Sequence, residues 1–170
     1  MPPKKVGVVM GSDSDLPLMQ DAIDTLKEFG IGFDVDIISA HRSPELAREY
    51  ALNAEKNGYE VIIAAAGAAA HLAGVLAAST PLPVIGVPMP GSALNGLDAL
   101  YAMVQMPPGV PVGTMAIGKP GARNAAIFAA QILAAADPDL RKKLKDFKKK
   151  LADGVAAKNK KVKAELGLAQ

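Results

Sequence analysis

Five short apolar runs rich in β-branched residues recur along this chain, and a stretch of helical periodicity follows each of them. Strands that alternate with helices favour a parallel sheet, because a parallel connection has room for a crossover helix. The runs are nearly continuous rather than alternating, as expected for strands covered on both faces. The predicted strands are 6–10, 35–38, 61–64, 84–87 and 112–117.

This alternation predicts an α/β fold, with three layers and a doubly wound sheet of five parallel strands. Right-handed crossovers favour the flavodoxin-like strand order 2-1-3-4-5. The chain of 170 residues contains no repeat or linker, so we expect a single domain over 1–170. Its core is expected at about 5–136, with an extra C-terminal helix at about 139–165. The other helices are expected at 16–29, 44–57, 70–79, 94–105 and 121–136.

Composition excludes several kinds of site. The chain has no cysteine, which excludes disulfides, a thiol nucleophile and cysteine-ligated zinc. No apolar run approaches the roughly 20 residues that a membrane-spanning helix needs. The first apolar run is too short for a secretory signal. These features predict a soluble cytoplasmic protein without a membrane partner.

The net charge of +2 conceals a strong asymmetry between body and tail. From Arg141 onward there are 11 basic and three acidic residues, against 8 basic and 14 acidic residues before it. A basic tail can indicate nucleic-acid binding, but this one lacks interleaved aromatic residues. Leucines and a phenylalanine recur in it at helical spacing, which leaves the lysines on the opposite side. We therefore expect a solvated helix face and no nucleic-acid partner.

Ligands of such sheets bind beyond the carboxyl ends of the strands, so the turns that follow the strands are where a site is expected. The first of these turns, 11–15, reads Gly-Ser-Asp-Ser-Asp and opens a helix. Ser12 can donate a hydroxyl to a phosphate oxygen, and Asp15 can accept from ribose hydroxyls. Serine and aspartate are also ordinary helix caps, so this turn alone leaves both roles open.

The second turn, 39–44, reads Ser-Ala-His-Arg-Ser-Pro. It places a histidine, which can carry a proton, beside an arginine, which can bind an anion. His41 is one of only two histidines, and histidine titrates near neutral pH. Arg42 supplies a planar fork for a phosphate. Ser43 is expected to cap the next helix, with Pro44 as its first residue.

The third turn, at 65–74, consists mainly of small residues, which let the backbone approach a flat ligand closely. His71 is expected just inside the helix that follows, either as a functional residue or as a packed, hydrogen-bonded one. A metal site shared by His41 and His71 is disfavoured, because neither an HxxxH spacing nor a third ligand is evident. We therefore predict no metal.

Five motifs occur here in one order: GSDSD, SAHRSP, AAHLAG, SALNGLDALYAMVQMPPGVPVGT and AIGKPGARNAA. In combination they resemble the bacterial 5-(carboxyamino)imidazole ribonucleotide mutases of purine biosynthesis, over about residues 5–135. The resemblance implies an isomerase without cofactor or metal. Such an enzyme moves a carboxylate from the exocyclic nitrogen to a ring carbon of aminoimidazole ribonucleotide. It also implies a homo-octamer.

By this resemblance His41 is the proton carrier, and Ser12, Asp15 and Arg42 contact the ribose phosphate. Many relatives have glycine where Ala65 and Ala68 stand, and alanine fits such a position only where φ is negative. A proline commonly stands at the position of Ala73. The predicted substrate-binding set is Ser12, Asp15, Ser39, Arg42, Gly67, Ala68 and His71.

Two other functions remain open from the residues. A direct carboxylase would use CO2 and aminoimidazole ribonucleotide on the same fold. A non-catalytic nucleotide- or flavin-binding module would also suit a flavodoxin-like sheet, since fold alone does not assign function. Aromatic residues make up only 4% of the chain, which argues against flavin because few side chains can stack on its ring.

Overall fold

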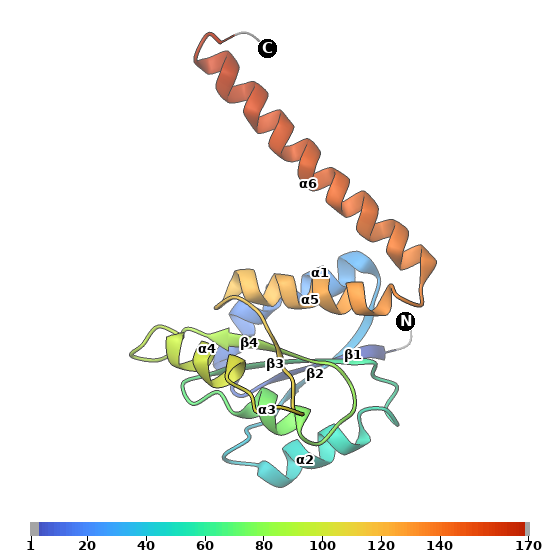
Figure 1. Cartoon of the computed structure of the whole chain (residues 1–170), viewed down its shortest axis with the longest axis vertical. Coiled ribbons are helices and arrows are strands. Elements are labelled where there is room, and N and C mark those ends of the chain that lie inside the picture. The colour runs from blue at the N-terminus through green and yellow to red at the C-terminus, as the bar shows by residue number, and fades with distance from the viewer. Residues whose placement is uncertain (1–3, 169–170) are drawn as a thin grey trace. The chain divides into compact units, whose positions relative to one another are not determined.

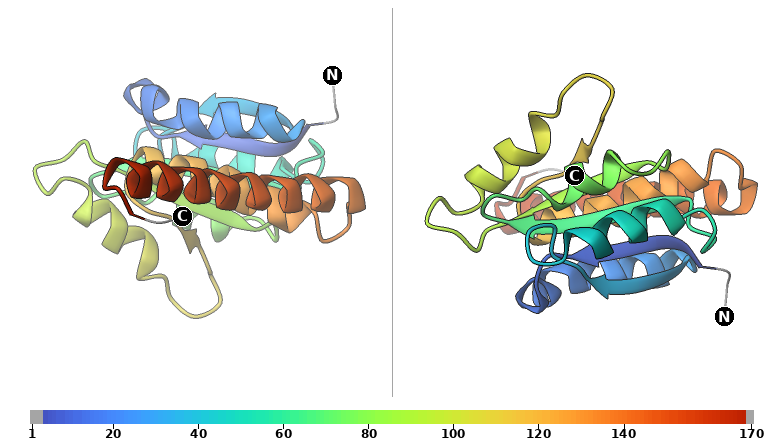
Figure 2. Two further views of the ribbon diagram at one scale, coloured as in Figure 1. Left: turned by 90° about the horizontal axis from the view of Figure 1, so that it is seen from above. Right: turned by 90° about the horizontal axis from the view of Figure 1, so that it is seen from below.

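A computed structural model describes residues 4–168 of the chain. Its sheet has five strands in the order β2-β1-β3-β4-β5, all parallel, which confirms the predicted fold class and strand order. Helices α1 and α5 cover one face of the sheet, and α2, α3 and α4 lie across the other (Figures 1 and 2). The elements are β1 (Lys4–Met10), the 3-10 helix η1 (Asp13–Asp15), α1 (Leu16–Phe29), β2 (Gly32–Ile37), α2 (Pro44–Asn53), β3 (Val61–Gly67), α3 (Leu72–Ala77), β4 (Val84–Met89), α4 (Leu97–Val104), β5 (Gly113–Thr114), α5 (Lys119–Leu133) and α6 (Pro138–Glu165).

The two central strands form the core of the sheet. Every residue of β4 is buried, and so is every residue of β3 except Gly67. Helix α5 packs closely on the sheet because its inward face consists of alanines, which are fully buried. These alanines are buried within one subunit. They are Ala122, Ala125, Ala126, Ala129 and Ala130.

Strand β5 is much shorter than the predicted run of 112–117. It pairs with β4 only through Gly113 and Thr114, which lie opposite Ile85 and Gly86. In a parallel strand, residues two apart bond to the same neighbouring strand. The Gly86 carbonyl accepts from the N–H of Met115, so the next bond of a regular ladder would need an N–H from Pro88. Proline has no N–H, and a regular ladder therefore cannot continue past this point.

Two helices begin later than their periodicity predicts, for one physical reason. Helix α4 was expected from residue 94, but Asn95 has φ 51° and Gly96 has φ 88°. Helix α3 was expected from residue 70, but Ala70 has φ 45°. A left-handed residue interrupts a right-handed helix, so each helix starts only after the last such residue.

The edge strand β2 departs from the expectation that strands are covered on both faces. Val35 and Ile37 are 39% and 55% exposed. Ser43 stands at the N-cap of α2, as predicted, but its side chain does not cap the helix. Its hydroxyl instead donates to the carbonyl of Ser39 at 2.9 Å and accepts from the Ser39 N–H at 3.1 Å. These two bonds tighten the turn after β2.

The chain divides into two compact units, one up to Ile132 and one from Leu133 onward. The second consists mainly of α6, where the carboxylate of Asp137 caps the first turn by accepting from the N–H groups of Asp139 and Leu140. Lys149 and Asp153 form an ion pair one turn apart, at 2.6 Å. Among the described residues, no helix is both long and apolar enough to cross a membrane.

Candidate active site

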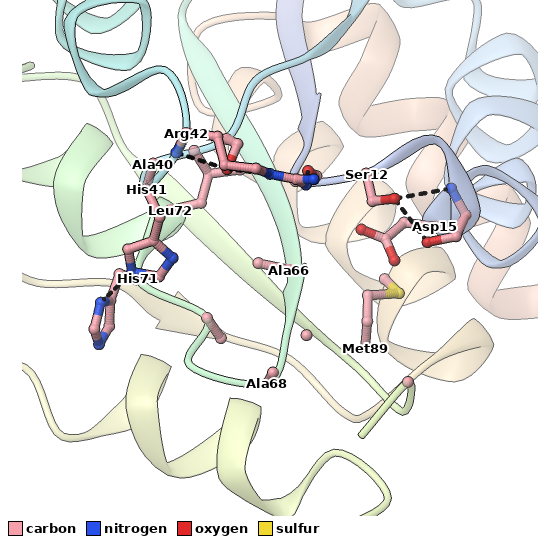
Figure 3. A pocket seen from close by; sticks show the side chains of 16 residues that line it. Ser12, Asp15, Ala40, His41, Arg42, Ala66, Ala68, His71, Leu72 and Met89 are labelled. Atoms are coloured by element: carbon pink, nitrogen blue, oxygen red, sulfur yellow. Dashed lines mark hydrogen bonds between the residues drawn. The ribbon is translucent and has the colours of Figure 1, made fainter. Parts of the chain in front are cut away.

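A cavity of about 430 Å³ opens at the carboxyl ends of β1, β2, β3 and β4, where the topology predicts a ligand. It collects side chains from turns that are far apart in the sequence. Ser12 and Asp15 lie at one end, and the rings of His41 and His71 lie at the other (Figure 3). All the predicted site residues line this cavity: Ser12, Asp15, Ser39, His41, Arg42, Gly67, Ala68 and His71.

Arg42 ties the ends of two strands together. Its Nε donates to the hydroxyl of Ser39 at 3.3 Å, and its terminal nitrogen donates to the carbonyl of Gly11 at 3.4 Å. The Ser39 hydroxyl also accepts from the backbone N–H of Arg42 at 3.2 Å. Both side-chain bonds are long and go to neutral oxygens, so an anion can compete for the exposed guanidinium.

The turn after β1 holds two of the predicted polar groups. The hydroxyl of Ser12 accepts from the Ser14 hydroxyl at 2.8 Å and from the Ser14 N–H at 3.3 Å, and it donates to Asp13 at 3.2 Å. Asp15 occupies the N-cap position of α1, but its side chain makes no capping bond. Its carboxylate can therefore accept from a ligand.

The electrostatic environment of Asp15 disfavours its charge. Partial burial raises the pKa of the Asp15 carboxyl above its usual value of 3.8, and the neighbouring Asp13 carboxylate adds to this rise. A hydrogen bond from the backbone of Ser12 opposes the shift. A carboxylate whose charged form is disfavoured in this way is a good acceptor for hydroxyl groups, because a hydrogen bond from a hydroxyl would stabilise the charged form.

The two histidines of the chain meet in this cavity. Nε2 of His41 lies 2.7 Å from Nδ1 of His71, and the rings cross at 72° with their centroids 4.8 Å apart. Both side chains are exposed, so neither ring is sealed in the core. The sequence placed His71 inside the following helix, but it stands at the N-cap of α3.

The turn after β3 has an unusual backbone. Ala68 has φ 52° and Ala70 has φ 45°, a region that favours glycine. The glycine of this turn, Gly67, has no positive φ, but the space around it is tight. A Cβ there would lie 3.3 Å from the carbonyl oxygen of Met89. The turn closes through the Ala70 N–H, which donates to the Gly67 carbonyl at 3.0 Å.

The predicted set missed the apolar part of the cavity. Ala66, Leu72 and Met89 line it and are all buried. Their signal was present in the sequence, since Ala66 lies one residue before the end of an apolar strand and Met89 ends another. Apolar residues at the ends of strands are usually ordinary core, however, so their position alone did not mark them.

The described residues contain no group of three or more histidine, cysteine, aspartate or glutamate side chains arranged to hold a metal ion. Within the part of the chain that the structure describes, no third ligand of these types joins the pair of His41 and His71. The polar groups of the cavity suit an anion and hydroxyls, and its apolar wall suits a flat or uncharged group.

Known proteins resemble this chain over most of its length. Residues 5–154 match the family model described as AIR carboxylase. The N5-carboxyaminoimidazole ribonucleotide mutase of Thermotoga maritima is 54% identical over 154 residues, which cover 91% of this chain and 89% of the relative. The mutase of Escherichia coli is 52% identical over 153 residues, or 90% of each chain. The crystal structure of Treponema denticola PurE is similar with a TM-score of 0.85 and 26% identity, covering 94% of this chain and 99% of that one.

Proposed function

The chain belongs to the AIR carboxylase family, and from that premise we propose that it isomerises a carboxyaminoimidazole ribonucleotide. The carboxylate moves from the exocyclic nitrogen to a carbon of the imidazole ring. Curated mutases share more than half of its residues over about nine-tenths of each chain, which supports this reaction. The observation that carries the proposed mechanism is that His41 and Arg42, neighbours in the chain, line one cavity.

Arg42, Ser12 and Asp15 hold the ribose phosphate. The guanidinium of Arg42 pairs with the phosphate, because a charged oxygen is a stronger acceptor than the neutral oxygens that it contacts in the free protein. The hydroxyl of Ser12 donates to the same phosphate, and Asp15 accepts from the ribose hydroxyls. This fixes the imidazole ring in the direction of the histidines.

His41 carries one proton through the reaction. Protonated His41 gives a proton to the exocyclic nitrogen, and the bond between that nitrogen and the carboxylate breaks to release CO2. The electron-rich ring carbon attacks the CO2 and forms a new carbon–carbon bond. His41 then removes the proton from this ring carbon, which returns the imidazole to its starting state.

The turn after β3 holds the migrating group. Between the two steps CO2 is neutral and small, and it must remain beside the ring carbon for the product to form. The apolar side chains of Ala66, Leu72 and Met89 exclude water from that part of the cavity. The backbone at Gly67 and Ala68, with the hydroxyl of Ser39, holds the carboxylate before the nitrogen–carbon bond breaks and after the carbon–carbon bond forms. Keeping the fragment in place is worth several kcal/mol as a proximity effect.

Replacement of His41 tests this mechanism. We expect His41→Asn to abolish turnover and to leave ribonucleotide binding largely intact, because asparagine keeps the polarity but cannot carry a proton near neutral pH. Absorbance follows turnover, and calorimetry of the ribonucleotide follows binding. Near wild-type turnover in the variant would refute the assignment of His41.

One alternative reaction has an observation in its favour. The family description names a carboxylase, which would join free CO2 to aminoimidazole ribonucleotide at the same ring carbon. Assays of both substrates side by side separate the two reactions. We expect this chain to turn over the carboxyamino substrate far more efficiently than it turns over aminoimidazole ribonucleotide with CO2.

We further propose a cytoplasmic homo-octamer. The octamer follows from the resemblance to the bacterial mutases, and a cysteine-free chain suits a reducing compartment. Helix α4 and the loop before it expose large apolar side chains that an interface can bury. Leu94, Leu97, Tyr101 and Val104 are each 49–60% exposed. Sedimentation of the purified chain measures the assembly.

A further inference from the structure

The turn after β3 contains two alanines with a left-handed backbone, and only one of them is packed into the core. Ala70 has φ 45°, is 3% exposed and belongs to a cluster of buried apolar residues. Burial of its methyl group offsets part of the cost of its backbone conformation. Ala68 has φ 52°, but its side chain is exposed and lines the cavity (Figure 3). Packing among the described residues therefore does not offset the strain at Ala68.

The surroundings of Ala68 make its methyl group part of a rigid wall. The turn lies close against β4, because a Cβ at the preceding Gly67 would be 3.3 Å from the carbonyl oxygen of Met89. The N–H of Ala70 closes the turn by donating to the Gly67 carbonyl at 3.0 Å. A turn held in this way cannot draw the methyl group back from the cavity. Strained backbone conformations cluster at functional sites, so this one points to a role for the side chain that carries it.

We propose that the methyl group of Ala68 determines the specificity of the reaction by keeping the released CO2 apart from the CO2 dissolved in the solvent. The inference rests on the proposed isomerisation. When the nitrogen–carbon bond breaks, aminoimidazole ribonucleotide and CO2 share the cavity, whose lining includes Ala66 and Met89. The two molecules then either form the carbon–carbon bond of the product or separate. A methyl group on the exposed wall of the cavity slows the separation, because it leaves CO2 less space through which to escape.

Isotope exchange measures the retention of CO2 directly. The unlabelled carboxyamino substrate is converted in buffer that contains isotopically labelled bicarbonate, and mass spectrometry gives the fraction of product that carries the label. Exchange in the absence of protein is subtracted. We expect Ala68→Gly to raise the labelled fraction about 3- to 10-fold over wild type, because loss of the methyl group opens the wall. Ala68→Ser keeps a Cβ at this position and should stay close to wild type.

Ala69→Gly is the matched control for this experiment. Ala69 lies in the same turn and is exposed, but it does not line the cavity, so its replacement should leave the labelled fraction at the wild-type value. Equal labelled fractions in wild type and Ala68→Gly would overturn the proposal, and so would a fully labelled product from wild-type protein. In both of these results the wild-type protein still forms product from the carboxyamino substrate. If it forms none, the proposed function itself fails, and the role of Ala68 fails with it.

Discussion

At the residue scale, the bonds that Arg42 makes in the free protein show how it would act on a substrate. Its guanidinium spans from Ser39 to Gly11 through contacts of 3.3 and 3.4 Å, and it remains exposed. Such weak contacts position the guanidinium before the substrate binds. Little free energy is lost when they are exchanged for contacts with a phosphate.

We therefore expect Arg42→Ala to raise KM by about 10- to 100-fold, the equivalent of one charge-assisted hydrogen bond, with a smaller effect on kcat. Steady-state kinetics measure both constants. Arg48→Ala is a matched control, because Arg48 is exposed on α2 and does not line the cavity. An unchanged KM in Arg42→Ala would mean that the phosphate binds elsewhere.

Asp15 supports a prediction about pH. Burial raises the pKa of its carboxyl, so the folded state disfavours the charged form. The contribution of the Asp15 carboxyl to the free energy of unfolding is fully present below pH 3.8, where the group is protonated. It is lost as the pH rises through the raised pKa that the group has in the folded state. Asp15→Asn removes this penalty, and it should raise the melting temperature at pH 7 while weakening ribonucleotide binding.

The gain in melting temperature should disappear as the pH falls below 3.8, where the native carboxyl is protonated as well. Calorimetry across this pH range, with the ribonucleotide titrated at pH 7, measures both effects. A variant that is less stable at neutral pH would show that the charge of Asp15 is satisfied within the fold.

The gathering of the site residues was predictable, and one contact among them was not. Parallel strands end at one edge of a sheet, so residues of three separate turns had to converge there. The bond between His41 and His71 depends on the turn after β3, where the backbone is left-handed at two alanines. Alanine rarely adopts that conformation, so the residue types of this turn do not predict it.

At the element scale, helix and strand ends follow from single residues. The bounds of α1 agree with its periodicity because Gly30, at φ 73°, ends the helix as a left-handed cap. The start of α3 was wrong because left-handed Ala70 carries no glycine signal, whereas the start of α4 was wrong because the helical periodicity from Leu94 was followed across the Asn95-Gly96 turn. The predicted length of β5 was wrong because the residue that interrupts its ladder, Pro88, belongs to the neighbouring strand β4.

The turn after β3 allows a direct test of backbone strain. Ala68→Gly should stabilise the protein by about 1 kcal/mol, because glycine adopts φ 52° without the penalty that alanine meets. Chemical denaturation measures the free energy of unfolding of each variant.

Ala69→Gly is the control for this substitution. Ala69 lies in the same turn, is exposed and has no positive φ, so glycine there should destabilise by about 0.5 kcal/mol through the entropy of the unfolded chain. Equal effects of the two substitutions would argue that Ala68 is not strained.

At the scale of the whole molecule, charge and chemistry occupy different parts of the chain. The cavity belongs to the acidic body, and the excess of lysine begins beyond it, at Arg141. The family match covers residues 5–154 and so includes the whole cavity. The overall architecture was predictable because it depends on a pattern repeated five times, which tolerates an error in any one element.

The most direct test of the central claim follows the proton itself. The substrate has a hydrogen on the ring carbon that receives the carboxylate, and the product has none, so proton NMR records its loss. With wild-type protein, this signal should decay as product absorbance grows, and with His41→Asn it should persist. Decay at a near wild-type rate in the variant would contradict the claim that His41 carries this proton.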